Sequence, residues 1–217
     1  MGKITAKVEA IAGKARAALS AKDAAREKAL RSSRDAVRYC SEAIRSVHRG
    51  EYSEARERLS SVREILNRMN EELEEHQDLL NSGFVYSAQK EYVEGCATLS
   101  LITESTIPEP EELGVGYAAY LNGLAEAVGE MRRHILDIIR RGETARCEEL
   151  LEAMDDIYGV LVTMDFPDAM TGGLRRTTDS TRGILERTRG DLTVAARQWE
   201  LEGKLAILEK KLIEEVS

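Results

Sequence analysis

The sequence predicts an all-α protein, a single domain of about six to seven antiparallel helices. Three observations lead to this fold class. The 217 residues include only 3 prolines and 5% aromatic residues, and alanine, leucine, glutamate and arginine are abundant, which favours helices over sheet. Apolar residues recur at intervals of three and four along most of the chain, as on one face of a helix. All three prolines and several of the glycines fall between these periodic stretches, where helices are expected to end.

The first quarter of the chain contains two helical segments of different character. Residues 1–24 are rich in alanine and lysine and only weakly periodic. They predict an N-terminal helical arm, either a first helix or a partly frayed segment, and residues 25–217 would form the helical domain itself. A regular apolar stripe from about Ala25 to His48 predicts the next helix, and Gly50 interrupts it.

The middle of the chain predicts two long helices and a loop. One helix spans about Ser53 to Asn81, and the Asn-Ser-Gly sequence at its end breaks it. The next spans Phe84 to about Glu104 and is apolar on more than one side, which predicts a central helix. Pro108 ends that helix, and residues 109–116 form a loop.

Two further helices and a long final one complete the prediction. Gly142 closes the first of them, after two arginines. Residues 165–173, with Pro167 and two glycines, form the loosest stretch of the second half, and Gly190 marks a candidate break in the last helix. These three helices span Tyr117–Arg141, Ala145–Met164 and Leu174–Leu212.

Charge and cysteine content exclude several classes of protein. The net charge of −8 argues against a protein that coats itself with nucleic acid, although a local basic groove is compatible with it. Cys40, Cys96 and Cys147 are odd in number and widely spaced, so they support neither a disulfide framework nor a zinc site. No stretch approaches the roughly 18 apolar residues that a membrane span needs. These features predict a soluble, cytoplasmic protein.

Four glutamates form two pairs with helical spacing. Glu91 and Glu94 lie three residues apart, and Glu126 and Glu130 lie four apart, so each pair shares one face of its helix. Both pairs lie among apolar residues that should face a core. Carboxylates are rarely buried unless something compensates their charge, and four that converged on one place would call for a divalent cation.

Three stretches of the sequence resemble the translin family and, within it, the branch of translin-associated factor X. They are residues 84–94 (FVYSAQKEYVE), residues 120–130 (YLNGLAEAVGE) with the following Met-Arg-Arg, and residues 174–179 (LRRTTD). The first two are specific in combination, whereas the third alone would be weak. The resemblance covers roughly residues 34–203, which is most of the chain.

The resemblance implies a fold and an activity. Catalytic members of the family are all-helical, assemble as octameric shells and cut single-stranded RNA in a magnesium-dependent manner. Their acidic residues fall at Glu91, Glu94, Glu126 and Glu130 of this sequence, although the third is an aspartate in the family. The additional methylene of Glu126 moves its carboxylate by about one bond length, which Mg²⁺ tolerates poorly, so Mn²⁺ is an alternative to Mg²⁺.

Each of the four glutamates receives a predicted role. Glu91, Glu94 and Glu126 are expected to hold the ion, and Glu130 is expected to be either a further ligand or the base that acts on water. From spacing alone, buried salt bridges to nearby arginines or to neighbouring subunits explain these glutamates at least as well. The resemblance shifts the balance toward a metal site.

Substrate binding needs positive charge near these acids. The candidates for nucleic-acid binding are two adjacent pairs, Arg132, Arg133, Arg175 and Arg176. Arginine contacts with phosphate give affinity without choice of sequence, although arginines on helices more often form a solvated face. His48 and His76 lie in charged surroundings and are expected to be exposed.

The predicted function is a metal-dependent endoribonuclease that acts on single-stranded RNA, with single-stranded DNA as a second candidate substrate. The resemblance implies a homo-oligomeric shell, an octamer, and a translin-like second subunit is a candidate partner. Two alternatives stay open: a non-catalytic translin-like protein that binds single-stranded nucleic acid, and a helical oligomerisation scaffold. The overall acidity slightly favours the scaffold, because a polyanion is repelled by like charge.

Overall fold

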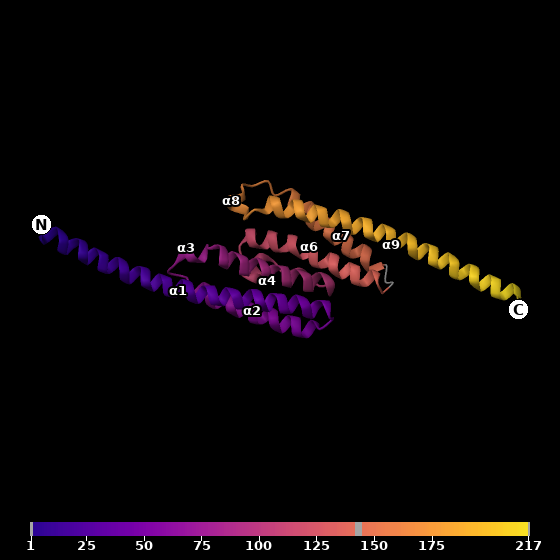
Figure 1. The fold of residues 1–217 in the computed structure, drawn as a ribbon, viewed down its shortest axis with the longest axis horizontal. Coiled ribbons are helices and arrows are strands. Elements are labelled where there is room, and N and C mark those ends of the chain that lie inside the picture. Colours follow the sequence, from indigo (N-terminus) through magenta and orange to yellow (C-terminus); the bar gives the residue numbers. More distant parts are fainter. Residues whose placement is uncertain (1, 142–144, 217) are drawn as a thin grey trace.

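The computed structural model describes residues 2–141 and 145–216, which form nine helices and no strand. The prediction of an all-α fold is therefore confirmed. Most of the helices run along the length of an elongated molecule, and the two ends of the chain lie at its opposite ends (Figure 1). The helices are α1 (Gly2–His48), α2 (Tyr52–Glu72), α3 (Gln77–Leu80), α4 (Gly83–Ile102), α5 (Pro110–Leu113), α6 (Tyr117–Ile139), α7 (Ala145–Val162), α8 (Asp168–Thr171) and α9 (Leu174–Val216).

Two predicted helix boundaries are wrong. The helix expected over residues 53–81 ends at Glu72, and α3 follows as a separate turn of helix. Neither glycine nor proline signals this end; the turn allows both Leu73 and Leu79 to be buried. The break expected near Gly190 is absent, since α9 continues to Val216. The predicted closure at Gly142 lies outside the described residues.

Both predicted loops contain a short helix. In α5, Pro110 occupies the first turn, where its missing N–H costs nothing. The side chains and backbone of Glu109 and Glu112 form a capping box, and Gly114 ends the helix in the left-handed conformation. The second short helix, α8, ends in the same way at Gly172, with φ +62°.

Helices α4 and α6 form the middle layer of the fold. Helix α1 packs on α2 and α4, α4 packs on α6, and α6 packs on α7 and α9. Figure 1 shows this order from the bottom of the view, at α2 and α1, to the top, at α9. The central position predicted for residues 84–104 is confirmed, because α4 contacts helices on two sides. The middle layer therefore joins two hydrophobic cores, one on the side of α1 and α2 and one on the side of α7 and α9.

The two longest helices extend beyond this packed body (Figure 1). Helix α1 contains residues 2–24 of the predicted arm together with the helix predicted to follow it. Large apolar side chains are exposed along the start of α1 and along the second half of α9. In these two segments they are Ile4, Val8, Ile11, Leu19, Val194, Leu201, Leu205, Ile207, Leu208, Leu212 and Ile213.

The three cysteines are core residues. Cys40, Cys96 and Cys147 are all buried. Burial raises the pKa of the Cys96 thiol to about 12, so this thiol stays protonated and unreactive near neutral pH. No helix in the described part of the chain combines the length and apolarity needed to cross a membrane.

Candidate functional site

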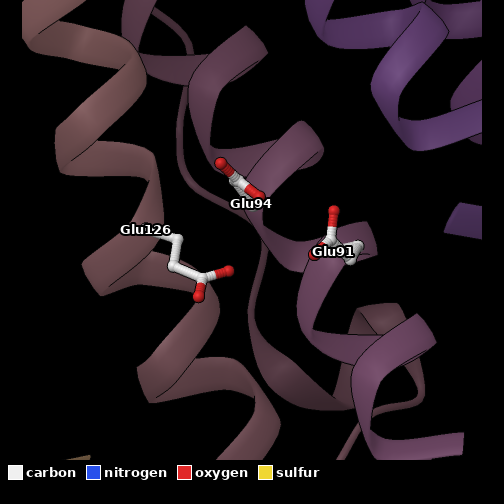
Figure 2. Close-up of side chains that lie close together, drawn as sticks. All are labelled: Glu91, Glu94 and Glu126. Carbon is white, nitrogen blue, oxygen red and sulfur yellow. The ribbon is translucent and has the colours of Figure 1, made fainter. Parts of the chain in front are cut away.

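Three of the four predicted glutamates lie together between α4 and α6. Glu91 and Glu94 of α4 and Glu126 of α6 each offer a carboxylate oxygen, and these oxygens lie within 4.8 Å of one another. Figure 2 shows Glu126 reaching from its helix toward the two glutamates of the neighbouring helix. We call these three residues the acidic triplet. All three are partly buried, as the apolar sequence around them predicts.

A glycine brings the two helices close enough to form the triplet. A Cβ atom on Gly123 of α6 would lie 2.6 Å from the carbonyl oxygen of Lys90 and 2.6 Å from Cβ of Val93, both on α4. Only a residue without a side chain permits this approach. Gly123 lies one helical turn before Glu126. The two α4 residues that it contacts, Lys90 and Val93, directly precede Glu91 and Glu94. The contact therefore sets the distance between the two sources of carboxylate.

Glu130 lies apart from the triplet and pairs with a histidine of α1. Its Oε2 is 2.5 Å from Nε2 of His48, and an arginine, Arg133, lies 3.6 Å away. The hydrogen bond from His48 lowers the pKa of Glu130. Electrostatic attraction from His48 and from Arg133 lowers this pKa further. An ionised carboxylate cannot donate, so Nε2 is the donor. The His48 side chain therefore favours the ionised form of Glu130.

The expected exposure of His48 is wrong, because its side chain is only 4% exposed. The sequence contains a signal for this burial. His48 lies four residues after Ile44, which belongs to the apolar stripe of the same helix, so both residues share the buried face. The surrounding charged residues conceal this signal. The other ring nitrogen of His48, Nδ1, is buried and has no hydrogen-bond partner within residues 2–141 and 145–216.

The acidic triplet has little positive charge to compensate it. Burial raises the pKa of Glu94 to about 8, and repulsion from the other three glutamates adds to this effect. Burial also raises the pKa of Glu91. The nearest cation is Lys90, whose Nζ lies 2.6 Å from Oε1 of Glu126 and 3.9 Å from Oε1 of Glu91. The ammonium group thus lies beside two of the three carboxylates, and carboxylate oxygens are the ligands that hard divalent ions prefer. The triplet thus fits Mg²⁺ or Mn²⁺.

The raised pKa of Glu94 predicts a pH-dependent stability in the absence of divalent ions. Between its ordinary pKa of 4.5 and its folded value of about 8, the folded chain retains a proton that the unfolded chain has released. The free energy of unfolding should therefore fall as the pH rises through this range. We expect Glu94→Gln to lose less thermal stability than the wild type between about pH 5 and pH 8.5 in EDTA. Equal losses in both proteins would show that Glu94 ionises like an exposed glutamate.

The four predicted arginines divide into two groups. Arg132 donates to the hydroxyl of Thr188 at 3.1 Å and pairs with Asp191 at 2.7 Å, and Arg175 pairs with Asp165 at 3.1 Å. Neither of them contacts the triplet. The other two, Arg133 and Arg176, line hollows in which side chains of the triplet are exposed.

The alternative that arginines neutralise the four glutamates fits one residue only. Glu130 has Arg133 nearby, whereas Glu126 pairs with Lys90 and not with an arginine. Among the described residues, Glu94 has no ion-pair partner, and its raised pKa reflects this. Arginines therefore do not neutralise the acidic triplet, whose ion pairs among the described residues are those of Lys90 with Glu126 and Glu91.

Comparisons with known proteins agree with this fold. No model of a protein family matches the chain. The uncharacterized protein MJ0175 of Methanocaldococcus jannaschii is 30% identical over 192 residues, which span 86% of this chain and 83% of that protein.

Solved structures give a similar result. The crystal structure of AfC3PO is similar at a TM-score of 0.79 and 32% identity, over 86% of this chain and 97% of that one. A structure of AfC3PO in complex with duplex RNA is similar at a TM-score of 0.76 and 33% identity, over 86% and 96% of the two chains. The crystal structure of apo-NeC3PO, at a TM-score of 0.75 and 20% identity over 85% and 96%, shows a likeness of fold alone.

Proposed function

We propose that this chain is a metal-dependent endoribonuclease. It belongs to the translin family, and it shares the fold of the C3PO structures, which are members of the same family. It would belong to the catalytic branch, with translin-associated factor X, and act on single-stranded RNA, with single-stranded DNA as a second candidate. One observation carries the proposal: Glu91, Glu94 and Glu126 converge across the contact of α4 and α6. The complex of AfC3PO with duplex RNA supports RNA as the class of substrate.

In this proposal the triplet holds the ion and Glu130 acts beside it. A divalent ion, when bound, lowers the pKa of water and neutralises charge that develops on a phosphate. Glu130 lies outside the triplet but lines the same hollow as Glu91 and Glu94. The hydrogen bond from His48 keeps its carboxylate ionised, so Glu130 can accept a hydrogen bond from the attacking water and orient it. His48, buried behind Glu130, fixes the position of this carboxylate.

The proposed enzyme is a homo-oligomer in the cytoplasm. The apolar side chains exposed on the projecting ends of α1 and α9 support self-association, since water disfavours an apolar surface of this extent. The octamer and the translin-like second subunit rest on the resemblance to the family.

A non-catalytic protein that binds nucleic acid is the second candidate. The ion pair between Lys90 and Glu126, at 2.6 Å, favours it because an ammonium group can stabilise the acids without a metal. Such a protein would bind a single strand whether or not a chelator is present, and would leave the strand whole.

The proposal predicts metal-dependent cleavage. A single-stranded RNA labelled at one end should be cut by the purified full chain in Mg²⁺ or Mn²⁺ and remain intact in EDTA. Denaturing gels measure the cut fraction, and a binding assay in EDTA runs in parallel. Binding without cutting in either metal would favour the non-catalytic protein, and loss of both would favour the scaffold.

A further inference from the structure

Three hollows follow one another along the surface beside the acidic triplet. One, of about 330 Å³, lies between α6 and α9 and is lined by Arg176 together with Glu94 and Glu126. The second, of about 310 Å³, lies among α1, α4 and α6 and is lined by Arg45 and Arg133 together with Glu94. Glu94 lines both hollows, so they adjoin at the triplet.

The third hollow extends this line along α6. It has a volume of about 450 Å³, and Arg133, which also lines the second hollow, contributes to its wall. Arg132 and Arg140 line it as well. Because neighbouring hollows share a residue, the three lie next to one another and together form a track, with basic side chains on both sides of the acids.

Two arginines in this track have no partner of their own. Arg45 and Arg176 are exposed, and neither side chain forms a hydrogen bond or an ion pair with any described residue. Arg132, in contrast, is held by Asp191. An unpaired, exposed guanidinium remains available for a phosphate, for which its flat, forked array of donors is suited.

We propose that a single strand of nucleic acid lies along this track, its phosphates bound by Arg176 on one side of the acidic triplet and by Arg45 on the other. This inference rests on the proposed function, because it takes the triplet as the place where the strand is cut. It adds Arg45 to the binding residues and removes Arg175, which lines a different hollow beside Asp165. In this arrangement the acidic triplet lies at one phosphodiester linkage of the strand. The phosphates on either side of that linkage lie beside the arginines.

The test measures binding without cleavage. A fluorescein-labelled single-stranded RNA is titrated in EDTA against the wild type, Arg45→Gln, Arg176→Gln and the double variant. Each single change should weaken binding about threefold to tenfold and lower the slope of log affinity against log salt by about one. The losses should multiply in the double variant, because the two residues lie in separate hollows. The control, Arg56→Gln on the exposed face of α2, makes the same charge change away from the track and should bind as the wild type does.

The outcomes separate this inference from the proposed nuclease. If both single variants bind within twofold of the wild type with an unchanged salt slope, the track is wrong, even if the protein cuts RNA. If binding depends on both arginines but no metal supports cutting, the inference about the track is supported and the proposed nuclease activity is contradicted. If the wild type binds no RNA, both the track and the proposed nuclease activity are contradicted. Circular dichroism and thermal melts confirm that the exposed substitutions leave the fold intact.

Discussion

Replacing Glu126 with glutamine should reduce RNA cleavage by at least about a hundredfold, because even a residue that only orients a metal ligand typically contributes 10–100-fold. Glu126 is the one member of the acidic triplet supplied by α6, so its loss leaves two carboxylates on a single helix. A neutral amide is a weaker ligand for a hard cation than a carboxylate. Single-turnover cleavage in Mg²⁺ and in Mn²⁺ measures the effect.

The same substitution should leave the fold unchanged. The Glu126 side chain is 33% exposed, and glutamine has nearly the same shape. Lys90 loses its main partner, but Glu91 remains 3.9 Å away, and one source of repulsion on Glu94 disappears. Glu57→Gln, an exposed change on α2, is the matched control. Full activity of Glu126→Gln would refute the assignment of the site, and a large fall in melting temperature would assign Glu126 a structural role instead.

Gly123→Ala should destabilise the chain by about 2 kcal/mol or more, since added volume in a well-packed core typically costs 1–3 kcal/mol. The new methyl group would lie 2.6 Å from the carbonyl oxygen of Lys90, and a backbone atom cannot move aside as a side chain can. Relief requires α4 and α6 to separate, which would also widen the acidic triplet. We therefore expect weaker cleavage together with lower stability.

Urea unfolding measures this effect, and the same helix offers a control. At Gly129 an added Cβ would have its nearest neighbour, Cδ1 of Ile184, at 3.9 Å, which is an ordinary contact. Gly129→Ala should therefore be neutral, or stabilise by up to about 1 kcal/mol through helix propensity. If Gly123→Ala proves as stable as Gly129→Ala, the two helices do not approach as closely as described.

The fold and the acidic triplet follow from the sequence to different degrees. Helical periodicity predicts the helices and assigns each glutamate pair to one face, but it does not say which glutamates meet across two helices. Glu126 and Glu130 share a face of α6, yet four residues along a helix amount to about 6 Å. That distance is enough to place Glu126 against the glutamates of α4 and Glu130 against His48 of α1. Only the packing of α6 against both neighbours decides this.

The arginine pairs show the same limit. Adjacent residues on a helix point about 100° apart, so two neighbouring arginines do not reach the same partners. Arg133 and Arg176 face the hollows beside the acids, whereas Arg132 and Arg175 face Asp191 and Asp165. The sequence identifies the pairs but not the member of each pair that faces the acids. Arg45, on α1, escapes prediction because it lies outside the family-like segments.

The ammonium group of Lys90 gives the chain a counter-ion of its own. It pairs with Glu126 from a position next to Glu91, so these carboxylates can be brought together during folding without an ion from solution. In many small metal-binding domains the ligands come together only with the metal, and a chelator unfolds them. In the proposed enzyme folding would precede loading, and the ion would compete with a lysine rather than with the unfolded chain. Removal of the ion would then return the protein to a folded resting form, ready to be loaded again.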